Sequence, residues 1–206
     1  MNFCVPNVTL RLYADDTTAY LSDVSPTILE FSFNKDLQTL SSWFESNHLT
    51  VNSSSKTQAL SVGPCDYHHS LFLNNARIEF LQSIKILGVT IDKDLSYKEH
   101  ISDQLKKAYR KASALRRIKR YLPLDAIIKL YKAFMLPHLE YCSPLFVSIG
   151  TGQRNRLEGG NCYILRTLIE HKKSMSYDEL LTTASMTSLY VLYCRHLHQA
   201  LLNTSF

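Results

Sequence analysis

The first part of the chain alternates short apolar runs with polar turns. Val8–Tyr13 (VTLRLY) and Thr17–Leu21 are rich in residues that suit a pleated surface, so both are expected to be strands. Ala14-Asp15-Asp16 stands between them, and the three segments together predict a hairpin with an acidic turn. Shorter strands are expected at Leu49–Val51, Ala59–Val62, Leu71–Leu73, Arg77–Phe80 and Ile84–Ile91, the last with a glycine inside it.

One amphipathic helix interrupts these strands. Ser25 suits the N-cap position, and Pro26 follows at the first helical position, where its missing N–H does no harm. Apolar residues then recur every three or four positions until about Asn47, at Phe33, Leu37, Leu40 and Phe44. That period predicts a helix with one apolar face.

From Tyr97 onward the apolar residues follow a helical period. A long amphipathic helix is expected over residues 101–122, and it ends at Pro123 because proline does not continue a helix. Another begins at Leu124 and runs to Met135. Loops that contain Gly150, Gly152, Gly159 and Gly160 are expected ahead of helices near Tyr163–Ile169, Tyr177–Ala184 and Leu189–Leu202. The pattern predicts an α+β fold, with a mixed part over residues 1–96 and an all-helical part over residues 97–206.

Length and composition are those of an ordinary globular protein. The 206 residues suit one domain or two small ones that share a core, and 45% of them are hydrophobic. No signal peptide or membrane-spanning stretch is visible, so an intracellular protein, cytoplasmic or nuclear and without a membrane partner, is expected. The five cysteines are an odd number without a CxxC pair, which favours free thiols over a disulfide framework.

Asp15 and Asp16 place two carboxylates at the tip of the expected hairpin. Such a site suits a divalent cation, and Mg²⁺ typically takes one or two protein carboxylates together with substrate phosphates. An acidic pair is weak evidence by itself, because aspartate is favoured in turns and most such pairs are simply solvated. The residues around the pair therefore matter more than the pair alone.

The segment LRLYADDTTAYL has the form of a polymerase motif: an apolar strand, then [FY]ADD, then threonine. Further blocks follow it, at Leu49–Asn52, Ser55–Thr57, Ile86–Asp92 with Leu95, Tyr97, His100 and Ile101, and Tyr131 with Leu136–Cys142. In this order and spacing, over roughly residues 8–145, the blocks resemble the C-terminal palm and thumb portion of a reverse transcriptase from a non-LTR (LINE-type, jockey-like) retrotransposon. The resemblance implies an incomplete polymerase palm of antiparallel strands and a helix over residues 1–96, followed by a helical thumb and C-terminal region.

The resemblance also implies a chemistry. Reverse transcriptases join a nucleotide to a primer 3′-hydroxyl with two Mg²⁺ ions that bridge the attacking and leaving oxygens. Asp15 matches the metal ligand, and Asp16 matches the second carboxylate beside it. Lys56 matches the family lysine that assists the departing pyrophosphate, although a loop lysine in water is an equal alternative. The implied partner is a primer–template, either an RNA/DNA hybrid or a duplex.

Two features depart from the family pattern. Three residues, Ser53-Ser54-Ser55, separate Asn52 from Lys56, whereas the family usually has two between its asparagine and lysine. One extra residue changes the reach of the loop by about 3.3 Å at most. Tyr97 replaces the usual tryptophan.

A third aspartate and the fingers precede the ADD motif in the family, whereas only fourteen residues precede Asp15 here. This chain by itself is expected not to polymerise, since the loss of one electrostatic element costs an enzyme about 10²–10³ in rate.

Positive charge is concentrated in one stretch. Residues 98–120 carry nine basic and two acidic residues, a net +7, whereas the whole chain is +5. Such a stripe favours a nucleic-acid backbone, because each neutralised phosphate releases counterions, and in the resembled family this region is the thumb. The expected contact residues are Lys106, Lys107, Arg110, Lys111, Arg116, Arg117, Lys119 and Arg120. The alternative is a solvated face opposite the core stripe.

Three functions stay open from the sequence: a segment of an RNA-directed DNA polymerase, a non-catalytic nucleic-acid-binding module, and a relic open reading frame with neither activity. Cys194, His196 and His198 lack the spacing of a zinc knuckle, and a tetrahedral site needs four ligands, so these residues are expected in the core or on the surface. The oligomeric state does not follow from the sequence.

Overall fold

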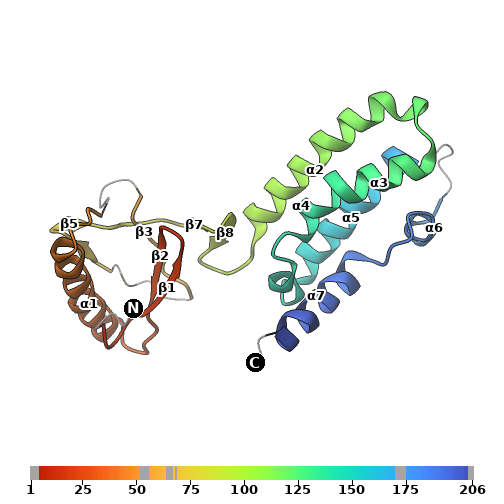
Figure 1. Ribbon diagram of the computed structural model, residues 1–206. Helices are drawn as coiled ribbons and strands as arrows, with labels where there is room; N and C mark the ends of the chain where they lie inside the picture. The colour runs from red at the N-terminus through yellow and green to blue at the C-terminus, as the bar shows by residue number, and fades with distance from the viewer. Residues whose placement is uncertain (1–4, 52–55, 64–66, 68, 170–174, 204–206) are drawn as a thin grey trace. The chain divides into compact units, whose positions relative to one another are not determined.

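The computed structural model describes residues 5–51, 56–63, 67, 69–169 and 175–203. The chain forms two compact units, Met1–Ile84 and Lys85–Phe206 (Figure 1). The first unit holds short strands and one helix, and the second is mainly helical, which agrees with the α+β expectation. By its contacts the segment 85–96 belongs with the helices, whereas the sequence predicts the change near residue 96. The assignment of palm and thumb to these parts stays a prediction.

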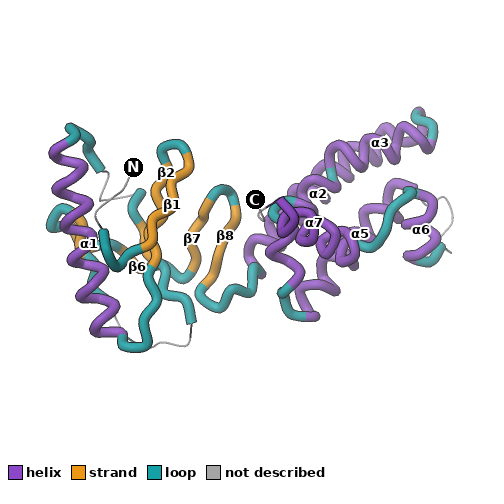
Figure 2. The backbone as a smooth tube through the Cα atoms, turned by 60° about the horizontal axis from the view of Figure 1, so that its bottom comes forward, coloured by secondary structure: helices purple, strands orange, loops and turns teal. Residues whose placement is uncertain are grey.

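The N-terminal hairpin has the predicted form. β1 (Thr9–Tyr13) and β2 (Asp16–Tyr20) pair antiparallel, with Tyr13 opposite Asp16, and Figure 2 shows them as one ribbon of two strands. α1 (Pro26–Ser46) follows, with Pro26 in its first turn as expected. Ser25 occupies the N-cap position, but its side chain makes no capping hydrogen bond.

The remaining strands of the first unit are only two residues long. They are β3 (Gln58–Ala59), β4 (Phe72–Leu73), β5 (Ala76–Arg77) and β6 (Glu79–Phe80). β4 and β5, at the expected strands Leu71–Leu73 and Arg77–Phe80, form an antiparallel hairpin around Asn74-Asn75, and both asparagines have positive φ angles, as a type I′ turn requires. β3 pairs with β6 in parallel, which departs from the expected antiparallel arrangement. The strand predicted at Leu49–Val51 is wrong, since that segment has no regular structure.

α1 supplies one side of the core of the first unit. Its buried leucines Leu37 and Leu40 pack with Leu71, Leu73 and Ile78 from the β4–β6 region. The side-chain amide of Asn34 adds two hydrogen bonds: it donates to the Ser70 carbonyl oxygen (2.9 Å) and accepts from the Phe72 N–H (2.9 Å). The helix therefore fixes the position of β4 by both apolar and hydrogen-bonded contacts.

The segment predicted as a single strand at Ile84–Ile91 is instead a hairpin. β7 (Ser83–Ile86) and β8 (Val89–Asp92) pair with each other, and Leu87-Gly88 forms the turn between them (Figure 2). Both turn residues have positive φ angles, 46° and 84°, the pattern of a two-residue type I′ turn. Gly88, which the sequence predicts to lie inside a strand, is therefore one of the two turn residues.

Helices make up most of the second unit (Figure 1). In chain order they are α2 (Lys98–Ile118), the 3₁₀ turn η1 (Lys119–Tyr121), α3 (Leu124–Phe134), α4 (Leu136–Glu140), the 3₁₀ turn η2 (Ser143–Val147), α5 (Thr151–Ile169), α6 (Tyr177–Thr183) and α7 (Leu189–Asn203). The predicted long helix, its end before Pro123 and the two C-terminal helices are confirmed within a few residues. None of the helices in the described ranges is long and apolar enough to cross a membrane.

α5 begins much earlier than the sequence predicts. Gly152, Gly159 and Gly160 lie inside this helix rather than in a loop. At Gly160 the reason is close packing, because a Cβ there would stand 2.4 Å from Leu105 Cδ2 and 2.9 Å from the Tyr109 hydroxyl oxygen. The missing side chain lets α5 approach α2 closely.

A buried polar network ties four helices of the second unit together. The Tyr131 hydroxyl donates to Asn161 Oδ1 (2.6 Å), and Asn161 Nδ2 donates to the Tyr177 hydroxyl oxygen (2.9 Å). Tyr177 in turn donates to Glu158, whose other carboxylate oxygen accepts from the Tyr190 N–H (2.9 Å). Burial raises the pKa of Tyr131 and Tyr177, so both stay neutral donors. The chain of bonds connects α3, α5, α6 and α7 inside an apolar core.

Candidate functional site

Asp15 and Asp16 lie at the tip of the β1–β2 hairpin. Ala14 and Asp15 are the two turn residues, and Asp16 is the first residue of β2. Ala14 has a φ of 52°, a left-handed conformation that costs a residue with a Cβ about 1–3 kcal/mol. Both aspartates are exposed, and neither side-chain carboxylate has a hydrogen bond or ion pair to another described residue. The turn thus presents two uncommitted carboxylates to solvent.

A buried aspartate positions this hairpin. Asp36 in α1 is 0% exposed, and its Oδ2 accepts from the Asn7 N–H and the Val8 N–H, both at 2.8 Å. Its Oδ1 accepts from Asn7 Nδ2 (3.1 Å). These three bonds fasten the chain just before β1 to the helix. Asp36 is not among the residues expected from the sequence, although a charged residue three positions after Phe33 on the apolar face of the helix is a visible signal.

The acidic turn fits a Mg²⁺ ion in part. Two adjacent exposed carboxylates are the hard oxygen donors that Mg²⁺ takes from a protein, with phosphates and water as its other ligands. Among the described residues no group of three or more histidine, cysteine, aspartate or glutamate side chains is arranged to hold a metal ion. Lys56 is exposed in a turn and has no ion pair with either aspartate in the described ranges. Asn52 and Ser53–Ser55, which precede Lys56, lie outside the described residues.

The basic residues of α2 spread around its solvent side. The buried side of the helix consists of His100, Ile101, Gln104, Leu105, Ala108, Ala112 and Leu115. Lys106, Arg110 and Arg117 lie opposite this stripe, by the helical period of 100° per residue, and are exposed. The acidic residues Glu99 and Asp103 stand before them in the first two turns, where the helix dipole favours negative charge. After Asp103 the charged residues of the solvent side are all basic, with Ser113, Ala114 and Ile118 as exposed uncharged residues.

The other expected contact residues differ in their surroundings. Lys107 and Lys111 flank the outer face on the side of α3 and α4, where Lys111 Nζ lies 5.8 Å from the centre of the Phe134 ring. Arg120 stacks over Tyr121 at 4.6 Å. Lys119 has a structural role, since its Nζ donates to the Thr167 carbonyl oxygen of α5 (2.7 Å) and its side chain is only partly exposed. Lys119 is thus the least available of the eight.

Two of the family-like blocks contact each other. The Tyr141 hydroxyl donates to the Leu87 carbonyl oxygen, and it lies against Gly88 at the turn of the β7–β8 hairpin. His100 is 1% exposed, and its Nδ1 accepts from the Thr90 N–H of β8 (3.3 Å). The block around residues 86–101 and the block around residues 136–142 therefore pack the hairpin onto α2 and α4. In this structure they have a packing role.

Buried His100 predicts a pH effect. Burial lowers its pKa, Lys107 and Lys85 lower it further, and Asp103 opposes them. Because the folded pKa lies below the unfolded value of about 6.5, protonation favours the unfolded state. We expect the helical unit to lose stability as the pH falls through 6.5 and below, by about 1.4 kcal/mol for each pH unit between the two pKa values. Urea unfolding followed by far-ultraviolet circular dichroism at a series of pH values measures this.

The variant His100→Phe keeps a ring in place and removes the titration, so its stability should depend less on pH. His198→Gln removes an exposed histidine and serves as the control. An equal pH dependence in wild type and His100→Phe would assign the effect to other groups, of which His138 also has a pKa lowered by burial.

The C-terminal cysteine and histidines show no metal site. His196 Nδ1 lies 2.7 Å from Ser143 Oγ, which links α7 to η2. Ser143 is 1% exposed and His196 is partly exposed, so the contact holds η2 against α7. Cys142, Cys162 and Cys194 are free, as predicted, and Cys4 and Cys65 lie outside the described residues.

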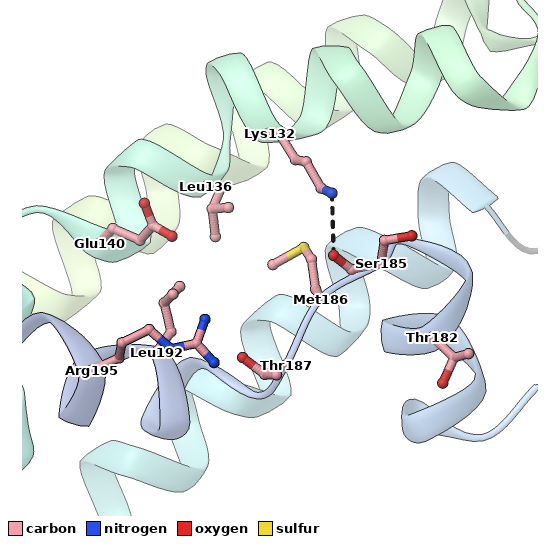
Figure 3. Close-up of a pocket in the computed structure, with 9 residues that line it drawn as sticks. All are labelled: Lys132, Leu136, Glu140, Thr182, Ser185, Met186, Thr187, Leu192 and Arg195. Carbon is pink, nitrogen blue, oxygen red and sulfur yellow. Dashed lines mark hydrogen bonds between the residues drawn. The ribbon is translucent and has the colours of Figure 1, made fainter.

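A hollow of about 500 Å³ lies between α4, the α6–α7 connection and α7. Figure 3 shows its lining, with Lys132 donating to the Ser185 carbonyl oxygen (3.3 Å) and with Glu140 and Arg195 on its other side. Burial raises the pKa of Glu140, although His196 opposes this. The hollow combines two cations, one carboxylate and several hydroxyl groups, and none of the residues expected from the sequence to bind or catalyse lines it.

A curated protein shares sequence with most of this chain. The RNA-directed DNA polymerase from mobile element jockey of Drosophila melanogaster is 27% identical over 142 residues, which cover 66% of this chain. The chain is a distant relative of a retrotransposon reverse transcriptase. The match spans only 15% of the length of that relative. No family model and no solved structure matches the chain.

Proposed function

We propose that this chain is the palm and thumb portion of an RNA-directed DNA polymerase and that its helical unit holds the phosphate backbone of a primer–template through α2. The observation that carries the proposal is the solvent side of α2 beyond its first two turns, where six of the nine exposed residues are cations: Lys106, Lys107, Arg110, Lys111, Arg116 and Arg117. The distant relative is named as an RNA-directed DNA polymerase, and for this reason we propose a primer–template as the nucleic acid.

The rigidity of α2 supports this role. Its buried stripe packs on α4 and α5, so the cations of the opposite side stand on a fixed scaffold. Lys106 forms an ion pair with Asp103 at 3.2 Å, and exposed pairs of this kind contribute about 0–1 kcal/mol. The cations therefore remain available to phosphates, and each phosphate contact releases counterions.

Binding of duplex DNA at several salt concentrations tests the proposal. We expect the triple variant Lys107→Ala, Arg110→Ala and Arg117→Ala to bind more weakly. Its log–log salt slope should be smaller in magnitude by about 2.7, because each contact with B-DNA contributes about 0.9. The matched control removes three exposed cations elsewhere, Lys35, Lys129 and Arg195, and should keep the wild-type slope. Binding that is absent, or insensitive to salt, would contradict the proposal.

The acidic turn enters the proposal as the place where Asp15 and Asp16 would hold Mg²⁺. A bound Mg²⁺ supplies neutralisation of phosphate charge. Asp15 follows Ala14 in the turn, and Asp16 is held as the first residue of β2 by its pairing with Tyr13. Lys56 would act there only as a nearby positive charge.

That this chain does not extend a primer by itself stays a prediction. A primer-extension assay with the purified chain in Mg²⁺ or Mn²⁺ tests it, and Asp15→Asn is the control variant. Incorporation that Asp15→Asn abolishes would contradict the prediction and would assign the acidic turn a catalytic role in the isolated chain.

A further inference from the structure

The seam between α2 and α5 carries exposed cations from both helices. It consists of two stripes: Ser102, Lys106, Tyr109, Ser113 and Arg116 on α2, and Arg156, Gly159, Tyr163 and Arg166 on α5. Residues three and four apart on a helix are surface neighbours, so each stripe is a continuous line. The four cations in the two stripes are all exposed.

Specific contacts hold the two stripes side by side. Arg156 Nη2 donates to Ser102 Oγ (3.2 Å), and the rings of Tyr109 and Tyr163 meet edge to face at 5.4 Å. Near the far end Lys119 Nζ bonds to Thr167. The contacts advance in the same direction along both helices, so α2 and α5 are parallel. The cations of α5 therefore accompany those of α2 along the seam.

Within α5, all of which the structure describes, no carboxylate lies on the seam, and on the α2 side Asp103 pairs with Lys106 (3.2 Å). Glu158 is the acidic residue of α5, and its two oxygens accept from Tyr177 and from the Tyr190 N–H inside the unit. Arg154 packs against α7 instead of the seam, because its guanidinium lies 3.7 Å from the centre of the Tyr190 ring. Arg156 and Arg166 are left on the outer side of α5, on either side of Tyr163.

Tyr163 gives the seam an aromatic surface. Its side chain is 57% exposed, although its ring edge contacts Tyr109. Gly159, one turn before it, has open space where a side chain would be, so nothing from that position covers the tyrosine. Proteins that bind single strands combine a positive groove with aromatic side chains on which bases stack. In a duplex the bases stack on one another and offer no face to a surface tyrosine.

We propose that the α2–α5 seam binds a single nucleic-acid strand, with phosphates on Lys106, Arg116, Arg156 and Arg166 and one base against Tyr163. The site rests on the proposed function in that α2 contributes two of these cations. Arg156, Tyr163 and Arg166 belong to the seam alone, and no residue among those expected from the sequence lies on α5.

The test uses the full chain and a labelled single-stranded oligonucleotide of about 16 nucleotides, beside a duplex of the same length. We expect Arg156→Ala with Arg166→Ala to weaken single-strand binding by about tenfold or more. The salt slope should fall in magnitude by about 1.4, because each contact with a single strand contributes about 0.7. Tyr163→Ala should weaken it by about 5- to 150-fold, the range for the loss of one base stack, and Tyr163→Phe should keep affinity within about twofold.

Two controls separate binding from folding. Circular dichroism melts identify variants that lose the fold, and the double variant Lys129→Ala with Arg195→Ala removes the same charge from α3 and α7 and should bind as wild type. If the α5 variants keep wild-type affinity while the Lys107, Arg110 and Arg117 variant loses it, the seam is overturned and the role of α2 stands. An equal loss for strand and duplex overturns the single-strand assignment, and no binding by the wild-type chain overturns both proposals.

Discussion

Asp36→Ala should unfold or strongly destabilise the first unit. The change leaves the N–H groups of Asn7 and Val8 without their acceptor, and Val8 is buried. An unsatisfied buried donor costs about 1–3 kcal/mol, so the free energy of unfolding should fall by about 3 kcal/mol. The hairpin that carries Asp15 and Asp16 would lose its fastening to α1 at the same time.

The single tryptophan, Trp43, lies in α1 and reports on this unit. Urea unfolding followed by Trp43 fluorescence should show the loss, while the circular dichroism of the helical unit stays close to wild type. Glu45→Ala removes an exposed carboxylate from the same helix and should change stability by less than about 0.5 kcal/mol. If the fluorescence transitions of Asp36→Ala and wild type coincide, the hydrogen bonds of Asp36 contribute nothing to the free energy of unfolding.

Gly160→Val should have the second largest effect, and of opposite sign to an alanine substitution one residue earlier. Gly160→Val places carbon atoms within 2.4 Å of Leu105 and 2.9 Å of Tyr109. Overpacking of this kind costs about 1–3 kcal/mol, and it pushes α5 away from α2. The melting temperature of the helical unit should fall by roughly 4 °C per kcal/mol, the value between those of smaller and larger domains.

Gly159→Ala is the comparison variant, because a Cβ at that position meets no atom within 4 Å. Alanine is better than glycine in a helix interior by about 0.8–1.0 kcal/mol, so this variant should melt at a higher temperature than wild type. Circular dichroism melts of the two variants measure both shifts. Shifts in the same direction would refute the assignment of Gly160 to the helix contact.

Local patterns predicted much of the fold because the local signals were consistent with each other. The strands on either side of Ala14-Asp15-Asp16 and the helix after Ser25 each have a period, a boundary residue and a suitable composition, and the structure confirms them. α2 is confirmed for the same reason, since its apolar stripe continues without interruption to Leu115.

The glycines were predicted less well, because a glycine has several structural uses that look alike in sequence. Gly88 was placed inside a strand and is a turn residue with positive φ, whereas Gly159 and Gly160 were placed in a loop and lie inside α5. Gly160 depends on Leu105, a residue far from it in the sequence. A pattern within one element contains no information about such a partner.

The candidate site was predicted from the sequence only in its exposed residues. Asp15, Asp16 and the cations of α2 stand where the sequence suggested, on a hairpin tip and on the solvent side of a helix. Asp36, which fastens the hairpin, and Arg156, Tyr163 and Arg166, which lie beside α2, were missed. Their importance comes from tertiary neighbours, and for Asp36 alone the sequence carries a signal.

The β7–β8 hairpin has a practical consequence for dissecting the protein. A fragment that starts at residue 97 would contain every helix of the second unit but would lack Thr90 and Leu87, the backbone partners of His100 and Tyr141. It would also lack Val89, which is buried in the whole protein, and would leave His100 in the first turn of α2 and Tyr141 after α4 without those bonds. Expression of the helical part should therefore begin at Ser83 or earlier, so that the whole hairpin is retained.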